Sequence, residues 1–109
     1  MMSVSTAFTC FMQEAPAQAA AWMQLAKSLD AASALDKKTE ELAYIAVLAA
    51  TGNTSGMPFH VLSARSHGAS RQEVLSAVLI GLPAAGAVVI GALPVAVEAY
   101  DGQDPSVVA

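Results

Sequence analysis

The sequence predicts an all-α fold, a bundle of about six helices, from three observations. Apolar and polar residues nowhere keep up the alternation with a period of two that a half-buried strand shows. Residues that favour helices, namely Ala, Leu, Met, Glu, Gln and Lys, dominate the composition. Proline, glycine and capping residues divide the chain into segments of ordinary helix length. For a chain of 109 residues we expect a single domain, residues 1–109.

Two helices are predicted in the N-terminal third of the chain. The first covers residues 5–14 and is closed by Pro16. The second covers residues 17–29. Three large apolar residues recur along it at helical spacing: Trp22, Leu25 and Leu29. We therefore expect Trp22 to anchor either the core or an interface.

Two further helices are predicted in the middle of the chain. The third helix covers residues 37–51, with Asp36 as its N-cap. A run of Gly, Asn, Thr, Ser and Gly then breaks the chain, and because no strand precedes it and no Lys follows it, we interpret it as a loop and not as a phosphate-binding motif. The fourth helix should begin near residues 55–57, because Pro58 is tolerated only in a first turn, and should end at Gly68.

The C-terminal part begins with a capping signal. Ser70 is followed three residues later by Glu73, which predicts a capping box at the start of a fifth helix. A break near residues 83–86 should lead to a last helix that ends by residues 101–102. Pro94 is expected to kink that last helix.

One uncharged stretch, residues 74–97, is long enough to cross a bilayer, which takes about 20 apolar residues. Much of it is Ala and Gly, however, and Pro83 and Pro94 interrupt it. The pattern favours two buried helices with a break between them, so we expect no membrane association. The tail, residues 103–109, is expected to fray.

The composition indicates which partners to expect. Hydrophobic residues make up 55% of the chain and charged residues 13%, against about 25% charged in a typical soluble domain. A lone monomer would leave apolar surface in water, so we expect a homo-oligomer. The net charge of −4 and a total of five Lys and Arg provide no basic cluster for nucleic acid.

Cys10 is the only cysteine, so it permits no internal disulfide and fits a reducing compartment. We expect it to be a small buried residue of the first helix and not a reactive thiol. Residues 1–14 contain no Lys or Arg and therefore lack the basic start of a secretory signal. The sequence predicts a cytoplasmic protein.

Glu41 is the first candidate for chemistry. At 100° per residue its side chain points between Ile45 and Leu48, which places a carboxylate in an apolar stripe. A carboxylate there needs a hydrogen-bonding partner or takes up a proton. Two interpretations stay open: a functional acid, or a first-turn residue that stabilises the positive end of the helix.

Four residues share one face of the following helix: His60, Ser63, Ala64 and His67. The two histidines are seven residues apart, about 10 Å along a helix, too far to share one metal ion, so we expect no metal site. Ser63 and His67 are secondary candidates for substrate contact. His67 immediately precedes Gly68, and a helix C-terminal cap explains it as well.

The spacing of these motifs resembles a known family. The segment LDKKTEEL at residues 35–42, then His60, then GAS at residues 68–70 and Glu73, is similar to the carboxymuconolactone decarboxylase family, which includes the alkyl hydroperoxidase D-like proteins. The resemblance covers about residues 35–100. It implies the alkyl hydroperoxidase D-like helical bundle, assembly as a trimer or hexamer, and a meeting of Glu41 with His60 between packed helices.

The resemblance also bears on the reaction. The peroxidase branch of the family carries a Cys-x-x-Cys motif followed after three residues by His, and here Asn53 and Gly56 occupy the two cysteine positions ahead of His60. The favoured hypothesis is a cofactor-free acid/base lyase or isomerase for a small carboxylated lactone or related carbon acid, with His60 and Glu41 as catalytic residues. One alternative is a peroxidase, which the missing cysteines disfavour, and another is a non-catalytic scaffold.

Overall fold

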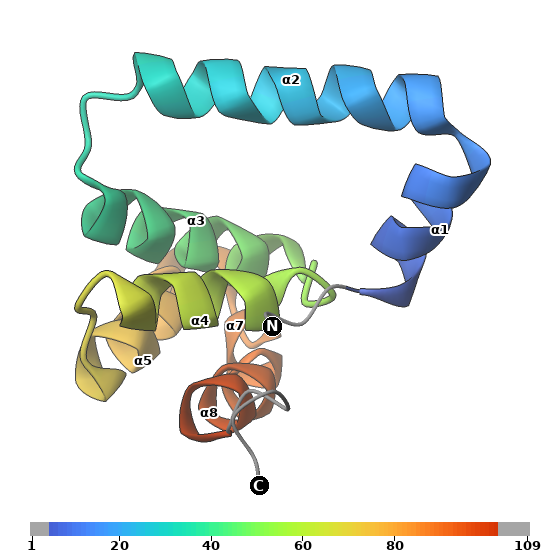
Figure 1. Ribbon diagram of the computed structural model, residues 1–109. Helices are drawn as coiled ribbons and strands as arrows, with labels where there is room; N and C mark the ends of the chain where they lie inside the picture. The colour runs from blue at the N-terminus through green and yellow to red at the C-terminus, as the bar shows by residue number, and fades with distance from the viewer. Residues whose placement is uncertain (1–4, 103–109) are drawn as a thin grey trace, which may run out of the picture.

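The structure is a computed structural model, and it describes residues 5–102. All regular structure in this range is helical: six helices of nine to 17 residues and two single turns of four residues (Figure 1). The prediction of an all-α bundle with about six helices is confirmed. The order is α1 (Thr6–Glu14), α2 (Pro16–Ala32), α3 (Lys37–Thr51), α4 (Met57–Ser66), α5 (Arg71–Leu79), α6 (Leu82–Ala85), α7 (Val88–Gly91) and α8 (Leu93–Asp101).

The hydrophobic core lies among α3, α4, α5, α7 and α8. Helix α3 packs against α4, α5 and α7, while α8 packs against α4 and α5. The largest fully buried side chains come from all of these elements except α8: Ile45, Met57, Val61, Val74, Val78 and Val89. Small residues such as Ala96 let α8 approach closely. Helices α3 and α4 lie side by side at the front of this bundle (Figure 1).

Helices α1 and α2 form an arm that stands apart from the bundle (Figure 1). They pack on each other, and Ala19 is the one buried residue of the two helices. Cys10 is exposed, so the prediction of a buried cysteine was wrong: α1 has no core to face. Trp22 is 40% exposed and Leu29 is 62% exposed. Trp22 is therefore no core anchor within this chain, and its part in an interface stays a prediction.

The predicted helix caps of the bundle are confirmed. Asp36 accepts a hydrogen bond from the backbone N–H of Thr39 at 2.8 Å, and α3 starts and ends at the expected residues. Gly52 ends that helix with φ of 70°, a conformation that glycine adopts without strain. Ser70 and Glu73 form both hydrogen bonds of the capping box of α5. These short-range signals fix both ends of α3 and the start of α5.

The C-terminal third departs from the prediction of two helices. The chain there forms α5, the single turns α6 and α7, and α8, with breaks at Gly81 and Gly86. Pro94 does not kink α8: it lies in the first turn, where a proline has no hydrogen bond to lose, so it begins the helix. No helix within residues 5–102 is both long and apolar enough to span a bilayer. The predicted frayed tail, residues 103–109, lies outside the described residues.

Candidate functional site

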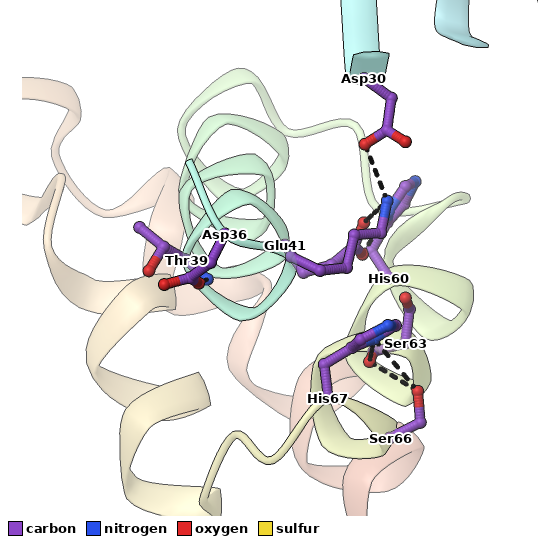
Figure 2. Close-up of polar contacts among 9 residues, drawn as sticks. Asp30, Asp36, Thr39, Glu41, His60, Ser63, Ser66 and His67 are labelled. Atoms are coloured by element: carbon purple, nitrogen blue, oxygen red, sulfur yellow. Dashed lines mark hydrogen bonds and ion pairs between the residues drawn. The ribbon is translucent and has the colours of Figure 1, made fainter. Parts of the chain in front are cut away.

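Glu41 and His60 face each other across the α3 and α4 interface (Figure 2). Nδ1 of His60 lies 2.8 Å from Oε2 of Glu41. The Glu41 side chain is only 6% exposed, and that of His60 is 25% exposed. The burial expected from the helical period is therefore confirmed. The interpretation of Glu41 as a first-turn residue is not confirmed, because Glu40 is the acidic residue of the first turn of α3.

The hydrogen bond between the two residues determines the state of the imidazole. When Glu41 is ionised it can only accept hydrogen bonds, and the hydrogen of this contact then lies on Nδ1 of His60. Within residues 5–102, no hydrogen bond engages Nε2 of the same ring. The His60 side chain is partly exposed, and Nε2 is the ring nitrogen that does not contact Glu41.

Lys37 supplies a second partner for the buried carboxylate. Its Nζ lies 3.6 Å from Oε1 of Glu41 and 3.1 Å from Oδ1 of Asp30, near the end of α2. Partial burial acts to lower the pKa of Lys37, but the hydrogen bond with Asp30 and the charge of Glu41 outweigh it and raise the pKa. Lys37 was not among the site residues predicted from the sequence. Its spacing of four from Glu41 on one helix was the available signal.

Two aromatic rings flank His60. The ring centroid of Tyr44 lies 4.3 Å from that of His60, and the centroid of Phe59 lies 5.2 Å from it. Both rings are about two-fifths exposed, at 39% and 40%. A planar organic molecule could therefore contact a ring and the imidazole together.

The secondary candidates form a separate cluster, one to two turns further along α4. His67 is the C-cap residue of α4, and its Nδ1 donates to the carbonyl oxygen of Ser63 at 2.8 Å. Figure 2 shows the His67 ring turned towards Ser63 and Ser66. The capping interpretation of His67 thus has direct geometric support. Ser63 is buried, and substrate contact by Ser63 or His67 stays a prediction.

A shallow groove of about 450 Å³ runs between α3 and α5. Its lining is mostly apolar and includes Leu42, Ala46, Ala77 and Ile80. Neither Glu41 nor His60 lines it, so the groove belongs to another face of α3. Across residues 5–102, no three His, Cys, Asp or Glu side chains gather as a group that could hold a metal ion.

The fold and the site define an all-α bundle that holds a carboxylate and an imidazole together between two helices. Residues 16–98 match the carboxymuconolactone decarboxylase family, and the chain belongs to this family. The match begins with α2 and so extends further towards the N-terminus than residue 35, where the resemblance in the sequence began. Comparisons with curated proteins and with solved structures gave no significant match.

Proposed function

We propose that this protein is a cofactor-free acid/base enzyme, a lyase or isomerase that acts on a small carboxylated lactone or a related carbon acid. His60 transfers the proton through Nε2, and Glu41 orients the ring through Nδ1. The observation that carries the proposal is the 2.8 Å hydrogen bond between a nearly buried carboxylate and a partly exposed imidazole. A positioned acid or base of this kind contributes about 10²- to 10⁴-fold to a rate.

Both candidate reactions, decarboxylation and isomerisation, need only the substrate, His60 and protons from solvent. In a decarboxylation, the bond between the carboxylate carbon and its neighbour breaks, carbon dioxide leaves, and the electron pair stays on the substrate as a dienolate-like carbanion. His60 takes a proton from solvent on Nε2, gives that proton to the carbon, and returns to the neutral form with hydrogen on Nδ1. In an isomerisation, Nε2 takes a proton from one carbon and returns it to another.

A peroxidase of the family's other branch is disfavoured by the residues present. That reaction needs a thiolate that attacks the peroxide and a second thiol that resolves the product. Asn53 and Gly56 occupy the corresponding positions and carry no sulfur. Cys10 is exposed on α1, in the arm that stands apart from the bundle that holds His60.

A non-catalytic scaffold is the second candidate, and one observation favours it. The groove between α3 and α5 is not lined by Glu41 or His60. In this alternative the pair is a polar clamp between α3 and α4, which stabilises their packing and turns over no substrate.

The exposed apolar residues support a further part of the proposal, that the protein acts as a homo-oligomer, a trimer or hexamer. Large apolar side chains are exposed on several elements of the chain. They include Trp22, Met23, Leu25, Leu29, Tyr44, Val47, Phe59, Ile80, Val88 and Ile90. Apolar surface on this scale is typical of a protein that buries it against other subunits.

The test is a turnover screen of carboxylated lactones and keto acids. Carbon dioxide release and the spectra of the products are the two readouts. His60→Gln should lower turnover by at least about 10²-fold, and Glu41→Gln by less, because an amide can still accept the hydrogen bond from Nδ1. Glu14→Gln, on α1 in the arm outside the bundle, is the control and should keep turnover. Turnover that survives His60→Gln, or a stable protein with no turnover on any carbon acid, would overturn the proposal.

A further inference from the structure

Four charged or ionisable side chains form a continuous chain from the end of α2 to the candidate acid/base residue. Oδ1 of Asp30 lies 3.1 Å from Nζ of Lys37, and the same Nζ lies 3.6 Å from Oε1 of Glu41. The other oxygen of Glu41 meets Nδ1 of His60 at 2.8 Å. Figure 2 shows this succession of contacts from Asp30 down to His60. The carboxylate of Glu41 is thus shared between two nitrogen bases.

The sharing has an electrostatic consequence for His60. A nearly buried carboxylate with a histidine as its only partner would favour the doubly protonated, cationic ring. Lys37 already provides one positive charge to Glu41, and a second positive charge on His60 would be repelled by it. Asp30 opposes this effect, because it draws the ammonium group of Lys37 towards α2.

The other titratable groups on the helices that pack against α4 are engaged elsewhere or face solvent, so Glu41, Lys37 and Asp30 are the charged groups that act on the His60 ring. From α3 the ring faces Glu41 and Tyr44. Helix α8 also packs against α4, but its titratable side chains are engaged elsewhere or face solvent. Asp101 pairs with Arg71, the hydroxyl of Tyr100 donates to Ala69, and Glu98 is exposed.

We propose that Lys37 is a positioning residue for His60: by sharing Glu41, it keeps the ring in the neutral form with hydrogen on Nδ1 and a free Nε2. The catalytic meaning of this role rests on the proposed function. Lys37 thereby favours substrates from which the ring first removes a proton, that is, carbon acids with an acidic C–H bond. Asp30 adjusts the strength of the effect from the other side.

The neighbouring lysine provides a matched control. Lys38 has a side chain 38% exposed, close to the 40% of Lys37, and it forms an ion pair of its own, with Glu73 at 2.9 Å. That partner lies on α5, away from His60. Lys37→Met and Lys38→Met therefore remove the same charge from the same helix, and only the first touches the chain to His60.

The experiment is an NMR titration of the two histidine rings in the full-length protein without substrate. In Lys37→Met, the pH midpoint of the His60 ring should rise by roughly 0.5 to 1 pH unit, the size expected for the loss of one nearby positive charge. In Asp30→Asn it should fall, because Lys37 then acts on Glu41 alone. Lys37→Arg should keep the midpoint of the unsubstituted protein. His67 is the internal reference and should not move in any variant.

The opposite signs for the Lys37 and Asp30 variants separate this role from a structural one. An unchanged midpoint in Lys37→Met, or an equal rise in Lys38→Met, would overturn the inference. Asp30→Asn decides the matter if circular dichroism shows that Lys37→Met is unfolded. Because the titration uses no substrate, its failure leaves the proposed function standing. A failed turnover screen, in turn, would remove the catalytic meaning but not the titration result.

Discussion

Nδ1 of His60 lies 2.8 Å from Oε2 of Glu41, although 19 residues separate the two in sequence. The two partners differ in burial: the Glu41 side chain is 6% exposed and the His60 side chain 25%. Loss of the histidine leaves the nearly buried carboxylate with only its longer contact to Lys37, at 3.6 Å, whereas loss of the carboxylate leaves a ring that water can reach. The two residues should therefore respond differently to substitution.

His60→Leu should lower the free energy of unfolding by about 1–3 kcal/mol, because it removes the hydrogen bond to a buried carboxylate. Glu41→Gln should cost less, since the amide oxygen still accepts from Nδ1. Urea unfolding at pH 7 measures both. With Glu41→Leu measured as a further single variant, the double variant Glu41→Leu/His60→Leu should be more stable than the sum of the losses in Glu41→Leu and His60→Leu implies. Equal costs for His60→Leu and Glu41→Gln would contradict the stabilisation assigned to the hydrogen bond that Glu41→Gln keeps.

Two glycines of the loop between α3 and α4 should differ sharply on substitution by alanine. Gly52 has a φ of +70°, and an added Cβ would lie 3.4 Å from Cγ2 of Val88, so Gly52→Ala should destabilise by about 1–2 kcal/mol. Gly56 has a φ of −89°, and nothing lies within 4 Å of an added Cβ. Gly56→Ala should be neutral or stabilise by up to about 1 kcal/mol. Thermal unfolding of both variants measures the difference. A Gly56→Ala variant less stable than Gly52→Ala would contradict the prediction.

Three acidic groups should make the fold sensitive to acid. The hydrogen bond from the backbone of Ser70, followed by that from Lys38, holds the pKa of Glu73 below its usual 4.5. Hydrogen bonding with Arg71 lowers the pKa of Asp101 below 3.8, and the backbone N–H of Thr39 does the same for Asp36. The unfolded chain then binds protons more readily than the folded one. This stabilisation is complete above the unfolded values and is lost as pH falls through the folded ones.

The measurement for this prediction is the urea midpoint from pH 7 to pH 3. It should fall with pH in the unsubstituted protein and fall less steeply in Glu73→Gln, which has no carboxylate to protonate. Glu14→Gln serves as the control, because Glu14 lies on the α1 and α2 arm outside the bundle. An identical slope in Glu73→Gln and in the unsubstituted protein would exclude the capping box as a source of acid sensitivity.

The local structure of the bundle was largely predictable from the sequence. The Ser70 capping box and the Asp36 cap depend on residues three apart, so their signals are complete within a short segment. Glu41 could be placed in the core because the helical period alone orients it. Its contact with His60 followed from the family resemblance, since no short-range signal joins residues on two different helices.

The rest depends on contacts between distant segments. Pro94 was expected to kink a long helix, but the chain turns at Ala92, which lets the same proline begin α8. Cys10 and Trp22 have the hydrophobicity of core residues, yet their helices stand apart from the core. The role of Lys37 was hidden because one of its partners, Asp30, lies near the end of another helix.

The exposed face of α2 should be a subunit contact if the protein is a homo-oligomer. Leu25→Glu/Leu29→Glu places two charges at positions that are 54% and 62% exposed, so it should leave the monomer folded and dissociate the assembly. Light scattering after size exclusion measures the mass, and Trp22, the only tryptophan, reports burial by its emission. Gln24→Glu/Ser28→Glu on the same helix is the control. A monomeric unsubstituted protein would contradict the proposed assembly.

The proposed function requires Nε2 of His60 to move a proton to or from carbon, and deuterium exchange at carbon measures that transfer. Carboxylated lactones and keto acids are incubated with the protein in deuterium oxide and followed by proton NMR. We expect stereospecific deuteration next to the carbonyl group, lost in His60→Gln and kept in Glu14→Gln, a control on the arm outside the bundle. Exchange that His60→Gln leaves unchanged, or no exchange on any carbon acid by the folded protein, would contradict the acid/base assignment and favour the scaffold.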